Sequence, residues 1–301
     1  MQIIHEFRLS YPISAIDKDE KHLTIITNDI CVHHYNNDNR LLYKHPLTDL
    51  TKEIHAYSNS VSISKDANLI LPTCTQKHVQ LYTVNDSIKE VTSELNQDDE
   101  IEASLFSKNN KFLILGNKAG RCNIYSRNTL SPVLELKPRP DYINALAISP
   151  TNRYLLASAY NKSVSVFDIS RAGNKTFYRT KSVIVNSLFL NNHQILSVLQ
   201  DGAVNIYDIQ AGEKIFEENL LPHWPSHLIV YNEKYILIST RSYAMYFFNI
   251  ETYEIDFEVK LSYKGVTAIQ RHEGFLYVGY YNGTVQVIDL NYQLNAFEVA
   301  R

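Results

Sequence analysis

The sequence predicts an all-β fold, and two observations carry this prediction. The first is a recurring pair of short apolar runs separated by a polar break, which is typical of two antiparallel strands joined by a tight turn. The clearest copies are Arg153–Asp168, Gln194–Asp208 and Phe275–Asp289. The second is the regular interval between copies, because a unit that repeats at a fixed period indicates a repeat architecture.

A bulky residue near the end of each copy marks the period, and in the strongest copies an Asp follows it directly. The marker residues are Tyr35, Tyr82, Tyr125, Phe167, Tyr207, Phe248 and Ile288, at intervals of 47, 43, 42, 40, 41 and 40 residues. Units of about 40 residues have the length of propeller blades, each a four-stranded antiparallel sheet. We therefore expect residues 1–301 to form a single domain, a seven-bladed β-propeller whose stacked blades bury faces that one sheet would expose.

Each repeat is expected to begin with an alternating strand that ends in a polar turn. These first strands are expected at Ile13–Ile16, Val61–Ser64, Ala103–Phe106, Ala145–Ile148, Asn186–Leu190, Leu228–Tyr231 and Val266–Ile269. The recurring pattern then supplies the second and third strands. Runs expected to form the fourth strand include Val133–Leu136, Ile215–Glu218 and Ile255–Leu261.

Two of the turns between second and third strands contain an Asp-Gly or Asn-Gly dipeptide. Asp201-Gly202 and Asn282-Gly283 are dipeptides that favour a type I′ turn, in which both central residues have positive φ. We expect type I′ hairpins at both places.

The two ends of the chain offer competing outermost strands for the last blade. Residues 6–11, Glu-Phe-Arg-Leu-Ser-Tyr, are close to residues 258–263, Glu-Val-Lys-Leu-Ser-Tyr, which end the sixth repeat. The N-terminal segment would pair with the last blade and tie the two ends together. Leu294–Ala300 has a similar strand pattern, so the sequence leaves open which strand closes the ring and whether that blade has five strands.

The period and the residues that end the third strands resemble those of the WD40-like family of β-propellers. Phe167-Asp168, Tyr207-Asp208 and Ile288-Asp289 stand where that family has Trp-Asp. The resemblance extends over essentially the whole chain, although no copy has Trp at this position and no Gly-His dipeptide precedes an innermost strand. It implies a non-catalytic protein-interaction scaffold or adaptor, an inference made by analogy of fold.

Composition and charge narrow the classes of partner. Apolar residues make up 45% of the chain and charged residues 20%, which favours a continuous core over disorder. The net charge of −3 argues against a nucleic-acid partner, because such binding depends on neutralising phosphates. No run approaches the roughly 20 apolar residues of a membrane span, and no basic, then apolar, leader is found. Cys31, Cys74 and Cys122 are odd in number and scattered, which predicts small buried residues in a reducing compartment and not metal ligands or disulfides. We expect the chain to be cytoplasmic and monomeric on its own.

No catalytic motif is found, whether a glycine-rich phosphate loop, Gly-x-Ser-x-Gly, His-Glu-x-x-His or Cys-x-x-Cys. We expect no catalytic residue, no metal and no cofactor. Neighbours on a strand face opposite sides, so His33 and His34 can hardly bind one ion, and one is expected to be buried and the other exposed. Asp98-Asp99-Glu100 is expected to be a solvated loop, because a hard cation needs further oxygen ligands.

Two alternatives stay open at this point. A propeller can assemble an active site from dispersed residues around its central axis, which would make the chain an enzyme. The chain also looks like the small propeller proteins that serve as accessory or assembly factors for bacterial respiratory metalloenzymes, for example periplasmic nitrate reductase, and a composition rich in Asn, Ile, Lys and Tyr agrees with such an origin.

Large amphipathic residues gather in two kinds of loop, namely the connection into each first strand and the turn between second and third strands. In a propeller these loops emerge on one face, here called the top face. Tyr, Trp and Arg bury much area, lose little rotamer entropy and keep a polar group, so they are frequent in binding hot spots. We expect protein binding on the top face through Trp224, Tyr142, Tyr160, Tyr243, Tyr263, Tyr281, Arg139 and Arg241. The competing interpretation is that a chain with 21 tyrosines wedges some of them between blades.

Overall fold

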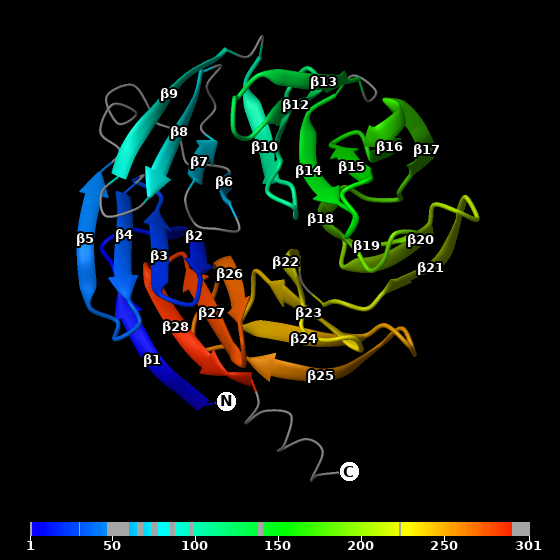
Figure 1. Ribbon diagram of the computed structural model, residues 1–301. Helices are drawn as coiled ribbons and strands as arrows, with labels where there is room; N and C mark the ends of the chain where they lie inside the picture. Colours follow the sequence, from blue (N-terminus) through cyan, green and yellow to red (C-terminus); the bar gives the residue numbers. More distant parts are fainter. Residues whose placement is uncertain are drawn as a thin grey trace. The chain divides into compact units, whose positions relative to one another are not determined.

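A computed structural model describes residues 2–29, 31–46, 60–64, 69–73, 78–84, 88–96, 99–137, 141–222 and 224–290. The described residues form seven four-stranded antiparallel sheets (Figure 1). The chain divides into two compact units, a terminal unit of Met1–Tyr57 with Ser226–Arg301 and a central unit of Ser58–Pro225. In the described part of the chain, no helix has the length and apolar character that a membrane crossing requires.

The central unit contains four sheets, each built from four strands that follow one another along the chain. Each sheet therefore has its first strand at one edge and its fourth at the other. The strands are β6 (Ser60–Ile63), β7 (Leu69–Thr73), β8 (His78–Val84), β9 (Ile88–Asn96), β10 (Ile101–Phe106), β11 (Phe112–Asn117), β12 (Cys122–Ser126), β13 (Pro132–Leu136), β14 (Ile143–Ile148), β15 (Tyr154–Ala159), β16 (Ser163–Asp168), β17 (Gly173–Arg179), β18 (Ile184–Phe189), β19 (Gln194–Leu199), β20 (Ala203–Asp208) and β21 (Glu213–Asn219). A short 3-10 helix, η2 (Ile169–Arg171), follows β16.

The terminal unit contains three sheets, two of which have the same consecutive order. The strands of these two are β2 (Ile13–Lys18), β3 (His22–Thr27), β4 (Cys31–Asn36) and β5 (Leu41–Pro46), and β22 (Pro225–Val230), β23 (Tyr235–Thr240), β24 (Ala244–Asn249) and β25 (Glu254–Lys260). The third sheet has the order β26 (Val266–His272), β27 (Phe275–Tyr280), β28 (Thr284–Asp289) and β1 (Gln2–Arg8).

The N-terminal strand β1, one of the two candidates that the sequence left open, completes the last sheet. It pairs antiparallel with β28 from Gln2 opposite Asp289 to Arg8 opposite Thr284, and Figure 1 shows it in blue beside the red β28. The Phe7 ring lies 5.1 Å from the Tyr35 ring of β4, so β1 also contacts the first sheet. The competing strand, residues 294–300, lies outside the described residues.

Neighbouring sheets within each unit bury their faces against one another. One apolar cluster joins residues of β14–β16 to residues of β18–β20, and another joins Leu23, Ile25 and Tyr35 to Tyr277 and Val285. The second and third strands are buried on both faces in the best-packed sheets, where every residue of β15, β16, β23 and β24 is buried. Consecutive four-stranded sheets packed face to face are the architecture of a β-propeller, which confirms the predicted class.

A β-bulge follows the first residue of five of the first strands among the described residues. The register shifts lie at Ile13/Ala15, Ile101/Ala103, Ile143/Ala145, Ile184/Asn186 and Val266/Ala268. A bulge re-aims the residue beside it, and the residue before each bulge is buried. Because the bulge interrupts the alternation, the predicted first strands at residues 103, 145 and 186 start two residues later than β10, β14 and β18.

The turns between second and third strands differ from the type I′ prediction. Gly202 and Gly283 have φ of +90° and +82°, but Asp201 and Asn282 do not have positive φ. Each glycine N–H donates to the carbonyl three residues earlier, which is a turn followed by one left-handed residue. The prediction was wrong because the Asx side chain takes part in the turn: Asn282 Oδ1 accepts the Thr284 N–H at 3.0 Å.

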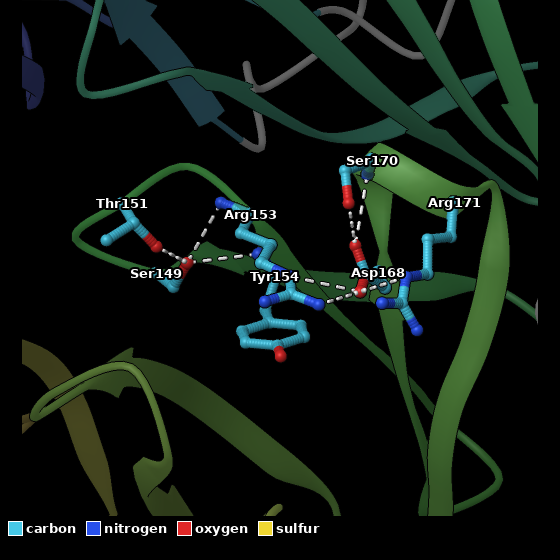
Figure 2. A network of polar contacts seen from close by, with 7 residues as sticks. All are labelled: Ser149, Thr151, Arg153, Tyr154, Asp168, Ser170 and Arg171. Atoms are coloured by element: carbon cyan, nitrogen blue, oxygen red, sulfur yellow. Dashed lines mark hydrogen bonds and ion pairs between the residues drawn. The ribbon is translucent and has the colours of Figure 1, made fainter.

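The Asp that ends the third strand caps the turn into the fourth strand. Asp168 Oδ1 accepts the N–H and hydroxyl of Ser170 at 3.1 and 2.6 Å, as Figure 2 shows. Asp208 similarly accepts the N–H groups of Gln210 and Ala211. In the β14–β17 sheet, Arg153 also donates two hydrogen bonds to Asp168 Oδ2 and holds the pKa of that carboxyl near 2. Asp168 and Asp208 of the repeat pattern are therefore structural residues.

Candidate functional site

The top-face loops of each sheet share one end of that sheet, because its four strands alternate in direction. Among the described residues, a backbone hydrogen bond joins the two kinds of loop in five sheets. The amide donors and carbonyl acceptors are Asn28 to Pro12, Lys118 to Glu100, Tyr160 to Tyr142, Gln200 to Val183 and Tyr281 to Gly265. Side chains on these loops are thus anchored to a fixed backbone.

In the central unit, Tyr142 and Tyr160 form an exposed aromatic pair. Tyr142 follows β13 and Tyr160 begins the turn after β15; their ring centroids lie 6.3 Å apart at 88°. About half of each side chain is exposed, 47% and 53% respectively. The ammonium of Lys118 lies 5.7 Å from the Tyr142 centroid and thereby joins two neighbouring sheets in one cluster.

Two carboxylates neutralise this lysine. Lys118 Nζ pairs with Glu100 and lies 3.3 Å from Glu102 Oε1. Hydrogen bonding to Glu100 raises the pKa of the Lys118 ammonium, so the lysine stays charged at neutral pH.

Trp224 lies on the connection from β21 to β22, between Pro222 and Pro225, and is 48% exposed. Two prolines restrict the backbone of this loop, which lowers the entropy lost when the indole is buried by a partner.

In the terminal unit, three loops carry exposed side chains and are linked in series. Gly265 N–H donates to the Arg241 carbonyl at 3.2 Å, and Tyr281 N–H donates to the Gly265 carbonyl at 2.9 Å. Tyr243 and Tyr281 are exposed, the latter at 61%, and the ammonium of Lys264 lies 5.3 Å from the Tyr243 centroid.

Tyr263, from the same connection as Lys264, is half-buried. Its ring packs 5.3 Å from the Tyr280 ring, and its hydroxyl donates to Glu6 Oε1 at 3.2 Å. Tyr263 therefore links the connection to β1, and only part of its ring is open to a partner.

Seven of the eight residues predicted for protein binding lie in the described part of the chain, and Arg139 lies outside it. The structure brings Tyr142 to Tyr160 in one unit, and Arg241, Tyr243, Tyr263 and Tyr281 to linked loops in the other. Lys118 and Glu102 were not predicted for the site, and Glu100 was expected only as part of a solvated acidic loop. Lys118 and Tyr142 belong to different sheets and meet only because of how one sheet is aligned against the next. A pattern of neighbouring residues in the sequence does not predict that alignment.

The expectation that one of His33 and His34 is exposed was wrong, because both are buried, at 6% and 4% exposure. The two side chains leave opposite faces of β4, but other groups cover both faces. The Thr24 hydroxyl lies 3.0 Å from His34 Nδ1, and burial lowers the pKa of His34 to about 4. Among the described residues, no group of three or more His, Cys, Asp or Glu could hold a metal ion.

Four-stranded antiparallel sheets, packed in series and bearing aromatic loops at one end, define a β-propeller protein of the repeat type. Comparison with known proteins agrees with this class: residues 130–168 match the family model described as WD domain, G-beta repeat. The matched segment covers β13 to β16 and ends at Asp168, the last residue of the third strand of the β14–β17 sheet.

The chain is also similar to the WD repeat-containing protein 55 homologs of Drosophila yakuba, Drosophila simulans and Drosophila melanogaster. It is 24% identical to each over 155 residues, which is 51% of this chain and 30% of each relative. The chain thus matches less than a third of the length of these relatives. The resemblance to WD40-like β-propellers is confirmed, and it supports a protein-interaction scaffold in general.

Proposed function

We propose that this chain is a non-catalytic scaffold or adaptor that binds partner proteins through the top-face loops of a seven-bladed propeller. The observation that carries the proposal is the set of exposed aromatic side chains on hydrogen-bonded loops, with Tyr142 against Tyr160 in one unit and Tyr243 and Tyr281 on linked loops in the other. The seven four-stranded sheets agree in number with seven blades.

Binding would gain from burying these rings, because each supplies a large apolar area and a polar atom at low entropic cost. The loops are already ordered by backbone hydrogen bonds, so little further order has to be imposed when a partner binds. A partner segment that presents apolar side chains would desolvate Trp224, Tyr160 or Tyr281, and Arg139 and Arg241 would orient its acidic groups.

We further propose that the chain works as a monomer in the cytoplasm. Cys31 and Cys122 are free and buried, which agrees with a compartment that keeps thiols reduced. Light scattering of the purified chain should give the mass of one chain, and self-association would contradict this part of the proposal.

Affinity purification of the tagged chain from its native cell tests the binding role. Trp224→Ala should leave the melting temperature unchanged, because the indole is half exposed, and should remove at least one co-purified protein. Leu42→Ala is the matched control, since Leu42 is equally exposed, at 51%, but lies on the fourth strand β5. Identical sets of co-purified proteins for the Trp224 variant and the unmodified chain would refute the proposal.

A further inference from the structure

Four side chains of the terminal unit, Arg241, Tyr243, Lys264 and Tyr281, form what we call the cationic loop cluster. They lie on the turn after β23, the connection from β25 to β26 and the turn after β27. The hydrogen bonds through Gly265 join all three loops, and Gly265 has φ of +71°. A Cβ added at Gly265 would lie 3.3 Å from Tyr281 Cβ, so these loops approach each other closely.

The charged side chains of this cluster are all positive. Residues 240–244, 261–265 and 280–283 contain two charged side chains, Arg241 and Lys264, and no carboxylate. Glu6 lies nearby on β1, but its two oxygens accept hydrogen bonds from Tyr263 and Gln286. Arg241 and Lys264 are both exposed, and Lys264 lies over the Tyr243 ring.

The aromatic pair of the central unit provides a contrast within the same chain. Lys118 lies over Tyr142 as Lys264 lies over Tyr243, at 5.7 and 5.3 Å from the ring centroids. Glu100 and Glu102 neutralise Lys118, whereas the loops around Lys264 contribute no acid. We therefore expect the terminal unit, and not the aromatic pair of the central unit, to prefer a negatively charged partner.

We infer that the cationic loop cluster selects acidic segments of partner proteins, with Arg241 and Lys264 as specificity-determining residues. An apolar side chain of the segment packs on Tyr281 and Tyr243. Carboxylates on either side of it accept hydrogen bonds from the Arg241 guanidinium and the Lys264 ammonium. The inference rests on the proposed function, because it names the chemistry of the partner for part of the top face.

Selection of a random dodecapeptide phage library on the full chain tests this inference. We expect enriched peptides to carry net negative charge beside an apolar or aromatic residue. For an enriched peptide, Arg241→Gln or Lys264→Gln should weaken binding about threefold and the double variant about tenfold, as for exposed charge pairs. The effect should shrink as salt rises from about 50 mM to about 500 mM, since exposed charges are screened.

Lys21→Gln is the matched control, because Lys21 is an exposed lysine of the same unit on the β2–β3 turn, at the other end of its sheet. It should bind the enriched peptides as the unmodified chain does. Circular dichroism and melting curves of all variants separate lost binding from lost folding.

The outcomes separate this inference from the proposed function. Enriched peptides without acidic bias, or acidic peptides that bind the double variant unchanged, would overturn the inference and leave the proposed function standing. Preferential binding of a thymidine oligonucleotide or of phosphatidylserine vesicles through the same two residues would also overturn it. If Tyr281→Ala and Trp224→Ala weaken the binding of none of the selected peptides, the result would count against both the inference and the proposed function.

Discussion

Gly279 of β27 should not tolerate a side chain, because the first strand of the neighbouring sheet lies against its Cα. A Cβ built at Gly279 would lie 2.6 Å from Ile13 Cγ2 and 3.0 Å from Ile16 Cδ1, closer than unstrained carbon atoms approach. The φ of Gly279 is outside the left-handed region, so Gly279→Ala tests packing and not backbone strain. Gly116 has the same relation to Ile143 in the central unit.

The magnitude follows from the cost of adding a methyl group to a packed core. Ile13 is 1% exposed, and forcing extra volume into such a site lowers the free energy of unfolding by about 1–3 kcal/mol. Ile13→Ala alone removes buried atoms and lowers it by about 2–5 kcal/mol. In the double variant, the 2.6 Å contact with Ile13 Cγ2 is gone, whereas the 2.8 Å contact with the Cβ of residue 13 remains. The relief is therefore partial, and the loss should be smaller than the sum by about 1 kcal/mol.

Urea unfolding followed by circular dichroism measures these free energies, and variants with equal m-values can be compared directly. Gly212→Ala serves as the control, since Gly212 has φ of +76° but no atom within 4 Å of an added Cβ. Its cost of about 1 kcal/mol comes from the backbone and should simply add to that of Ile13→Ala. Additive losses for Gly279→Ala with Ile13→Ala would refute close packing of β27 on β2.

Two further predictions concern groups with shifted pKa. Burial lowers the pKa of His34 from 6.5 to about 4, so the unfolded chain binds a proton first and stability falls as pH drops from about 6.5 to 4. The loss is at most about 3 kcal/mol, and His34→Gln should make this part of a urea-midpoint-against-pH curve less steep. Some slope should remain, because burial also lowers the pKa of His227 to about 4, and an unchanged slope would contradict the prediction. Hydrogen bonding by Arg153 and Ser170 holds the pKa of Asp168 near 2, so Asp168 contributes stability above about pH 4 that disappears by pH 2. Asp168→Asn should lower the free energy of unfolding by about 1 kcal/mol at pH 7, with little effect at pH 2, and an equal loss at both would show that the charge is not involved.

Features decided by a few neighbouring residues could be predicted from the sequence. The repeat period and the strand pairs follow from alternation and turn residues. The likeness of residues 6–11 to residues 258–263 made the N-terminal strand one of two candidates for the last sheet. The turn type could not be predicted, because the Asn282 side chain stabilises a turn with one left-handed residue. Nor could the burial of both His33 and His34, since alternation gives the face of a side chain and not what covers that face.

The candidate site was predictable to the same extent and for the same reason. Loop positions follow from strand order, so the sequence could place Tyr142, Tyr160, Tyr243 and Tyr281 on top-face loops. Contacts between loops of different sheets depend on how one sheet is aligned against the next, and Lys118 over Tyr142 is such a contact.

The buried strands and the exposed loops differ in whether they tolerate charged residues, and this difference determines where such a protein can acquire selectivity for a partner. Strands such as β15 and β24 are buried along their whole length, so a charge placed there would lose its hydration without a partner. Loop ends lack this constraint, and a lysine over a tyrosine ring is neutralised by two carboxylates at Lys118 but has no acid in its loops at Lys264. The same local arrangement can therefore serve a neutral or an acidic partner according to one or two loop residues, while the sheets that hold it stay unchanged.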